Sequence, residues 1–427
     1  MIWPYRSVIT GIKNVAAVIS TLDLPPDPCC LLTPCPLAME LMYTSILLSM
    51  GIRVAYTTSE TLMPRSSAGH ADEGTNGLVY DLELVHPEII LAVPQTLNEI
   101  KKMFDESPCI QLKSFLYVNN HSKPKLCSKI SWPRDGDQYM LKYRLFGGKL
   151  KVLLIGSAQI SPETYNFFKK KLDVSNIVQY YNCAESCSCI LMDADGQSIG
   201  NCGFPLWGTF VRLIDWPEGG YFVTDQPYPR GEIVIGGDSV SDGYFKDGYL
   251  NAGVLVEEYG KTWCITGDIG EILPDGSVRV IDRKKDLLRL PSGNQVSPSR
   301  VESELKTSSI VQNVFVHGNP KFDYVVAIIR PNENEIMEMA NVLGKEDSFP
   351  FLCYDEDIKH LVLRQIQDHC RSRCFYEYEI PKKIRLSSHR WTSEVGFVTD
   401  FITGGYKPRR YQIREFFKHD LSMMYDK

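Results

Sequence analysis

Residues 263–302 bring together acidic, basic and glycine residues that could bind hydroxyl and phosphate groups. Asp268 closes a Thr-Gly-Asp run, and an ionised aspartate, which only accepts hydrogen bonds, suits a pair of sugar hydroxyls. Arg283 offers a rigid fork of N–H donors that suits phosphate oxygens. Taken alone, the two residues would more simply be a turn-capping aspartate and an exposed arginine. Their surroundings must decide between the two interpretations.

The surrounding motifs resemble the adenylate-forming synthetases in their long-chain fatty acyl-CoA version. The matching positions around Asp268 are Trp263, Gly267, Gly270, Pro274, Gly276, Asp282, Arg283, Lys284, Lys285, Gly293, Pro298 and Glu302. Upstream, Arg230 to Gly237 and Gly243-Tyr244 resemble the preceding motif of the same family. Residues 217–247 look like the subgroup that prefers polyunsaturated chains such as arachidonate. The resemblance covers nearly the whole chain.

This resemblance implies a ligase that uses ATP, Mg²⁺ and CoA. It would convert a long-chain fatty acid into acyl-CoA, AMP and diphosphate through an acyl-adenylate. Asp268 matches the ribose-binding aspartate, and Arg283 matches the arginine that meets the same ribose and phosphate. Lys285 matches the hinge residue, although a solvated charge run is the simpler alternative. Lys407 resembles the catalytic lysine that neutralises charge developing on the phosphate. Matching Lys407 to this lysine requires a short insertion before it, which also aligns Arg409 with the family motif.

The resemblance also assigns two further segments to the nucleotide site. Residues 181–185 stand where the family has Tyr-Gly-x-Thr-Glu, so Tyr181 is expected to stack on adenine. Glu185 is expected to be catalytic and to hold Mg²⁺, a hard cation that prefers oxygen ligands. Asn182 and Ala184 depart from the family pattern, and Ala184 lacks the hydroxyl that could bond a phosphate or carboxylate oxygen.

The turn at residues 156–159 resembles the one beside the acyl and adenine pockets. Gly156 and Ser157 are therefore expected near the nucleotide, and Ala158 near the fatty acid. Met39 stands where the family has histidine. It cannot donate a hydrogen bond, although its thioether could pack against a lipid chain.

The family's Ser/Thr/Gly-rich loop, which wraps the triphosphate through backbone N–H groups, would precede Met1. We therefore expect an N-terminally truncated chain that still binds AMP or acyl-adenylate but makes little or no acyl-CoA. The alternative from another class is a non-catalytic pseudoenzyme of the same fold that binds an acyl group, an adenylate or a partner.

Short apolar runs alternate with helical patterns through the first 280 residues or so. The run Ile89–Val93 ends at Pro94, and residues 152–155 form a buried strand followed by a capped helix start at Ser161. This is the order of an α/β domain. Residues 204–237 contain short strands broken by Gly and Pro. The expected fold is the α/β adenylate-forming fold, in three parts. Its divisions are a partial AMP-binding large domain with a β-rich subdomain (1–283), a hinge (284–286) and a small α+β lid domain (287–427).

The composition fits a large globular protein. The chain has 427 residues, of which 44% are hydrophobic and 23% charged, and a net charge of -6 argues against general nucleic-acid binding. The apolar run at residues 37–56 carries Glu40 and Arg53, so it predicts a helix and a strand, not a membrane span. Thirteen cysteines without a secretory signal indicate free thiols, and two cysteine clusters lack zinc-site spacing. By family, the chain is expected at the cytosolic face of the endoplasmic reticulum or another organelle, with a long-chain fatty acid as partner and peripheral membrane contact.

Overall fold

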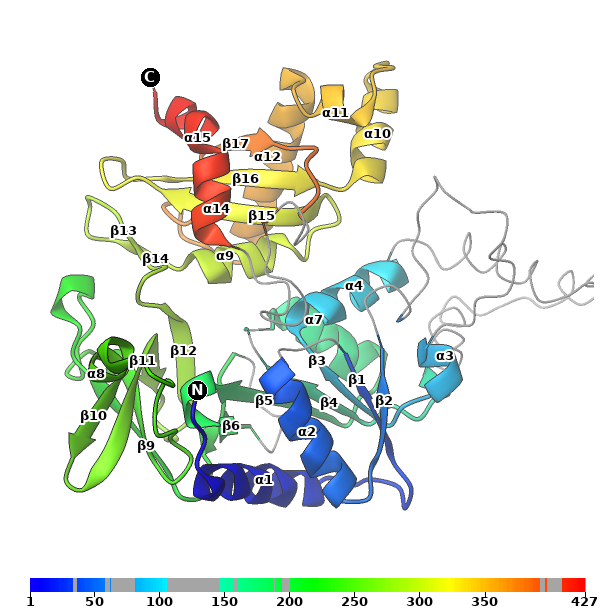
Figure 1. The fold of residues 1–427 in the computed structure, drawn as a ribbon. Helices are drawn as coiled ribbons and strands as arrows, with labels where there is room; N and C mark the ends of the chain where they lie inside the picture. The colour runs from blue at the N-terminus through cyan, green and yellow to red at the C-terminus, as the bar shows by residue number, and fades with distance from the viewer. Residues whose placement is uncertain are drawn as a thin grey trace, which may run out of the picture.

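In the computed structural model, the C-terminal elements lie above the N-terminal ones, and strand β12 leads from one group to the other (Figure 1). Residues 1–283 form what we call the large body, and residues 287–427 the C-terminal body. The structure describes residues 1–33, 37–57, 62, 81–105, 146–156, 158, 160–187, 189–193, 200–391, 396–397 and 409–426.

The large body is built on a seven-stranded sheet of order β2-β1-β3-β4-β5-β6-β7. The first five strands of this order are parallel, and β6 and β7 join antiparallel at one edge. The strands are β1 (Cys29–Leu32), β2 (Arg53–Tyr56), β3 (Ile89–Ala92), β4 (Val152–Ile155), β5 (Asn176–Asn182), β6 (Cys189–Met192) and β7 (Phe204–Pro205). β1, β3 and β4 are buried along their whole length, as parallel strands covered on both faces require.

Helices cover both faces of this sheet. One face packs against α1 (Tyr5–Ser20) and α2 (Leu37–Ser49), and the other against α3 (Asp81–Val85), α4 (Pro94–Asp105) and α7 (Pro162–Asn166). α7 begins where the sequence predicts, because the Ser161 hydroxyl accepts a hydrogen bond from the N–H of Thr164. It continues as a π-helical turn, Phe167–Lys171. The predicted helix-strand order of residues 37–56 and the predicted strand and helix at residues 89–100 are confirmed.

The expected β-rich subdomain is an antiparallel sheet of order β10-β11-β9-β8, with β12 added to β11. Its strands are β8 (Thr209–Ile214), β9 (Arg230–Gly237), β10 (Leu255–Glu258), β11 (Lys261–Ile272) and β12 (Val278–Arg283). Short helical turns lie at Ala184–Ser186, at Pro217–Gly219 and in α8 (Gly248–Val254). In Figure 1 this sheet stands beside the parallel sheet and below the C-terminal body.

The C-terminal body is the predicted α+β unit. A short hairpin, β13 (Leu288–Arg289) and β14 (Gln295–Val296), leads into a sheet in which β16 lies between antiparallel β15 and parallel β17. The remaining elements are α9 (Pro298–Leu305), β15 (Val311–Gly318), β16 (Val325–Pro331), α10 (Glu333–Val342), α11 (Phe349–Leu352), α12 (Glu356–Ser372), β17 (Lys383–Leu386), α14 (Arg410–Phe416) and α15 (Lys418–Tyr425). Within the described residues, no helix has both the length and the apolar composition to cross a bilayer.

The two bodies have separate interiors. Hydrophobic clusters formed by described residues draw either on positions up to 280 or on positions from 288 onward, and none mixes the two. Such separation is what a domain boundary near residue 283 would give. The boundary itself stays a prediction.

Candidate functional site

A β-bulge in β11 sets the position of Asp268. The pairing register between β11 and β9 shifts between Ile265 and Ile269, and Gly267 has a φ of +71°, a left-handed value that favours glycine. The Thr266 hydroxyl bonds back to the carbonyl of Ile233 and accepts from the N–H of Asp268 at 3.1 Å. Bulges of this kind redirect a side chain without ending the sheet.

Two of the residues that the sequence picks out, Tyr181 and Arg283, converge on a third, Asp268. Asp268 is buried, with 6% of the residue exposed. Its Oδ2 accepts a hydrogen bond of 2.5 Å from the Tyr181 phenol. Oδ1 lies 3.3 Å from Nε of Arg283, the directly opposite residue on β12. Tyr181 comes from β5 of the other sheet, so the group spans the junction between the two sheets. A nucleotide-binding role for these residues remains a prediction.

The phenol of Tyr181 is a donor over the ordinary pH range. Burial, reinforced by the charge of Asp268 and the hydrogen bond to it, raises the pKa of Tyr181 well above its usual value. A protonated phenol therefore donates to the carboxylate of Asp268. A ligand that supplies hydroxyl donors, such as a sugar, can replace the phenol at Oδ2 without leaving the carboxylate unsatisfied.

Glu185 is held by contacts that sequence reasoning missed. Its Oε1 accepts a short hydrogen bond from the Tyr244 phenol, and its backbone carbonyl accepts from the N–H of Ser241 at 2.8 Å. The Trp3 indole donates to the carbonyl of Ala184 at 2.9 Å. In the sequence, Tyr244 stands out only as part of a motif. It lies 59 residues from Glu185, so no local sequence pattern predicts their contact.

Glu185 offers one carboxylate to the expected Mg²⁺. Its carboxylate is half-buried, and among the described residues only one of its two oxygens has a recorded partner. Burial and the neighbouring Glu185 raise the pKa of Tyr244, so its phenol stays protonated and donates to the carboxylate. The carboxylate of Glu185 thus offers an oxygen ligand, the type that a hard cation prefers.

The remaining predicted residues are less well placed. Gly156 is buried against the ring of Tyr180, where an added Cβ would lie 2.2 Å from ring carbons, so close packing requires glycine there. Ala158 is exposed. Met39 lies on α2, and its side chain is outside the described part of the chain, as are the whole of Ser157 and Lys407.

Lys285 occupies an exposed turn directly after β12. Its two neighbours contact different bodies: Lys284 Nζ lies 3.0 Å from Glu232 of β9, and Asp286 lies 3.7 Å from Arg410 of α14. Lys285 thus stands between two anchored residues. This position suits a hinge, and the hinge role stays a prediction.

The model of the family described as "AMP-binding enzyme" matches residues 4–245 of the chain. Long chain acyl-CoA synthetase 8 of Arabidopsis thaliana is 32% identical over 408 residues, which are 91% of this chain and 55% of that protein. Long-chain-fatty-acid–CoA ligase 5 of Rattus norvegicus is 26% identical, over 81% of this chain and 50% of its own length. The chain therefore spans about half the length of the curated relatives it matches.

Solved structures share the fold. The A-PCP didomain of carboxylic acid reductase from Segniliparus rugosus, in complex with AMP, superposes with a TM-score of 0.73 at 23% identity, covering 99% of this chain and 51% of that one. O-succinylbenzoate coenzyme A synthetase of Bacillus subtilis, also with AMP, gives a TM-score of 0.57 at 18% identity, covering 96% of this chain and 65% of that one. These neighbours confirm the expected α/β adenylate-forming fold.

Proposed function

Because this chain belongs to the family of AMP-binding enzymes, we propose that it acts as a long-chain fatty acid–CoA ligase. The reaction would join a fatty acid to the AMP part of ATP, release diphosphate, and then transfer the acyl group to the thiol of CoA. The curated relatives carry this activity in their names. The observation that supports it in the chain itself is the convergence of Tyr181, Asp268 and Arg283.

In this proposal the carboxylate of Asp268 accepts the two ribose hydroxyls of the nucleotide. The phenol of Tyr181 gives up Oδ2 to a ribose hydroxyl while its ring stacks on adenine. Arg283 is 55% exposed at its side chain, so its guanidinium can turn from Asp268 toward the ribose and the α-phosphate. The bulge at Gly267 fixes the carboxylate before the ligand arrives.

Other roles complete the proposal. Glu185 would hold Mg²⁺, which lowers the charge on the phosphates when bound. Lys407 would donate to the reacting phosphate. Gly156 and Ser157 would line the nucleotide site, and Ala158 and Met39 would contact the acyl chain. Lys285 would act as the hinge between the large domain and the lid.

Binding and turnover test different parts of this proposal. Calorimetric titration of the purified chain with AMP should give a saturable signal that Asp268→Ala weakens. Acyl-CoA formation should then be measured with palmitate or arachidonate, ATP, Mg²⁺ and CoA, on this chain and on a fusion to the preceding segment of a curated relative. Absence of AMP binding by both proteins would contradict the nucleotide site. AMP binding without turnover in the fusion would contradict the ligase.

A further inference from the structure

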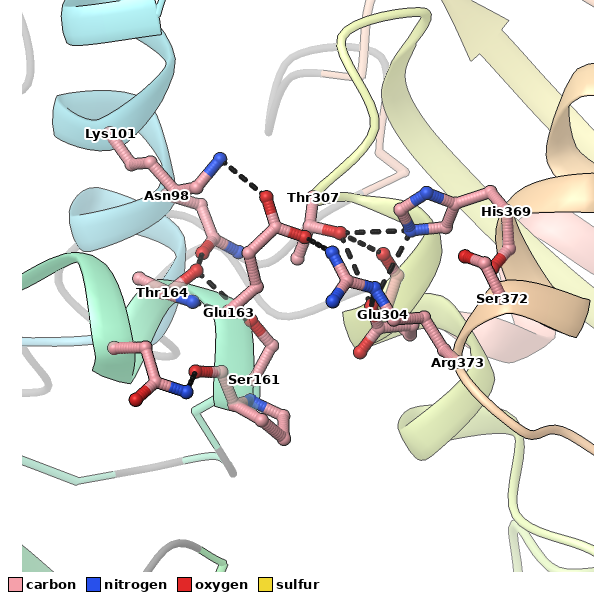
Figure 2. Close-up of polar contacts among 12 residues, drawn as sticks. Asn98, Lys101, Ser161, Glu163, Thr164, Glu304, Thr307, His369, Ser372 and Arg373 are labelled. Atoms are coloured by element: carbon pink, nitrogen blue, oxygen red, sulfur yellow. Dashed lines mark hydrogen bonds and ion pairs between the residues drawn. The ribbon is translucent and has the colours of Figure 1, made fainter.

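A second polar cluster lies away from the nucleotide residues, where α4 and α7 of the large body face α9 and α12 of the C-terminal body (Figure 2). We call it the seam. Its charged members are Lys101, Glu163, Glu304, His369 and Arg373. Figure 2 shows Glu163 pointing across from the large body to Arg373.

Arg373 connects the two bodies. Its guanidinium forms an ion pair with Glu163 of α7, and its Nε lies 3.2 Å from Oε1 of Glu304 in α9. On the other side, Lys101 Nζ lies 2.7 Å from Oε1 of Glu163. A second bond crosses the seam nearby, from Lys102 Nζ to the carbonyl of Val311 at 2.6 Å. The bodies are therefore tied through polar groups, in contrast to their separate apolar interiors.

Buried neighbours fix the groups on both sides. In the large body, the Thr164 hydroxyl, next to Glu163, donates to Asn98 at 2.5 Å. In the C-terminal body, the His369 ring lies 3.0 Å from the Thr307 hydroxyl and 3.4 Å from Glu304. The side chains of Lys101 and Glu304 are each only 8% exposed. Groups positioned in this way lose little side-chain entropy when the ion pair forms.

The charges at the seam balance without a ligand. Glu163, Glu304 and His369 present ligand atoms within 4.8 Å of one another, a spacing that could hold a metal ion. Two carboxylates, however, already face two cations, Lys101 and Arg373, so an added divalent cation would leave excess positive charge. A cavity of about 310 Å³ beside these groups admits water, so the ion pair remains accessible to salt.

We propose that Glu163 and Arg373 form a latch that holds the C-terminal body against the large body in the orientation seen here. Outside the seam, the described contacts between the bodies lie near the chain connection at residues 283–286. Asp282 accepts hydrogen bonds from the Ser297 and Ser299 hydroxyls, and Arg289 donates to the carbonyl of Glu218. Loss of the latch would let the C-terminal body turn about that connection. This inference does not depend on the ligase proposal.

Trypsin cleavage within the connection tests the latch, because Arg283, Lys284 and Lys285 offer cleavage sites there. Cleavage rates at these bonds, followed by mass spectrometry, should rise about two- to fivefold in Glu163→Gln and in Arg373→Gln. The double variant should cleave no faster than either single variant, since both lose one interaction. Raising the salt concentration should accelerate cleavage of the wild type but not of the double variant.

Arg371→Gln is the matched control, because Arg371 pairs with Glu377 at the same end of α12 but within one body. Its cleavage rate should equal that of the wild type. Circular dichroism melting should show that all variants remain folded. Wild-type cleavage rates in the two single variants, additive effects in the double variant, or equal acceleration by Arg371→Gln would each overturn the latch.

Discussion

Two of the carboxylate–arginine pairs in the molecule have opposite origins. Asp268 and Arg283 are register partners on adjacent strands of one sheet. Glu163 and Arg373 lie 210 residues apart and meet only because two bodies face each other. The first pair keeps its geometry as long as the sheet is folded, whereas the second exists in one relative orientation of the bodies. The Asp268–Arg283 pair is thus suited to ligand recognition, and the Glu163–Arg373 pair to control of orientation.

The largest expected effect is on AMP affinity and comes from Asp268→Ala, which leaves the seam unchanged. Removing the carboxylate deletes the acceptor for the ribose hydroxyls, and charged hydrogen bonds of this type correspond to about a 10- to 100-fold loss in AMP affinity. Calorimetry measures this loss, with Asp275→Ala in an exposed turn as the control. The seam contacts are intact in ligand-free Asp268→Ala, so trypsin cleavage after Lys285 should be closer to the wild-type rate than in Glu163→Gln. Unchanged AMP affinity would remove Asp268 from the site.

Arg283→Lys should have a smaller effect on the same pair. Lysine keeps the charge but loses the planar fork, so we expect about a fivefold loss in AMP affinity. Arg279→Lys is the matched control, because Arg279 lies on the same strand and pairs with Glu271. Equal losses in both variants would show that the effect does not come from the guanidinium geometry of Arg283.

Tyr181→Phe should separate stability from binding. Loss of the phenol leaves Oδ2 of Asp268 without this donor, so the free energy of unfolding should fall by about 1 kcal/mol. AMP affinity should be nearly unchanged, because ribose hydroxyls replace the phenol and the ring remains. Urea unfolding and calorimetry measure the two quantities, with the exposed Tyr5→Phe as the control. A large loss of affinity at unchanged stability would contradict the replacement of the phenol by ribose.

The smallest expected effect is that of pH on the Glu163–Arg373 ion pair at the seam. Burial alone would raise the pKa of Glu163, but the hydrogen bond from Lys101, together with the charges of Lys101, Arg373 and His369, holds it below its usual value. Glu163 therefore stays ionised, and the latch intact, at all pH values above the ordinary range of glutamate, about pH 4.3. The latch should be lost only as pH falls through the lowered pKa.

Small-angle X-ray scattering should show constant dimensions from neutral pH down to about pH 5 and an expansion below pH 4, while the protein remains folded. The Arg373→Gln variant already lacks the latch at neutral pH, so it should expand less. Glu304, the other acidic group of the seam, is retained in this variant, so equal expansion of both proteins would assign the change to other carboxylates.

The sequence indicated the contact between Asp268 and Arg283 but not the seam, for physical reasons. The strand at residues 152–155 and the capped start of α7 follow from local patterns, and both are confirmed. The meeting of Asp268 and Arg283 is a cross-strand contact, which strand pairing and a glycine bulge produce over a short stretch of chain.

The contacts of Tyr244 with Glu185 and of Arg373 with Glu163 have no such local origin. Each joins residues from elements that are distant in sequence, and exposed arginines at helix ends are common. Their partners are set by the packing of whole sheets and bodies, which no spacing rule encodes. Lys407 and Ser157 lie outside the described residues, so their roles stay predictions.

Strand β12 ends at Arg283, and the chain leaves the large body immediately afterwards. A ligand that draws the guanidinium away from Asp268 therefore acts at the base of the connection, next to the anchored Lys284. Coupling between such sites is reciprocal: the factor by which a nucleotide favours one orientation equals the factor by which that orientation favours the nucleotide. The change in AMP affinity between two orientations and the change in the orientation equilibrium on AMP binding would thus give the same coupling free energy.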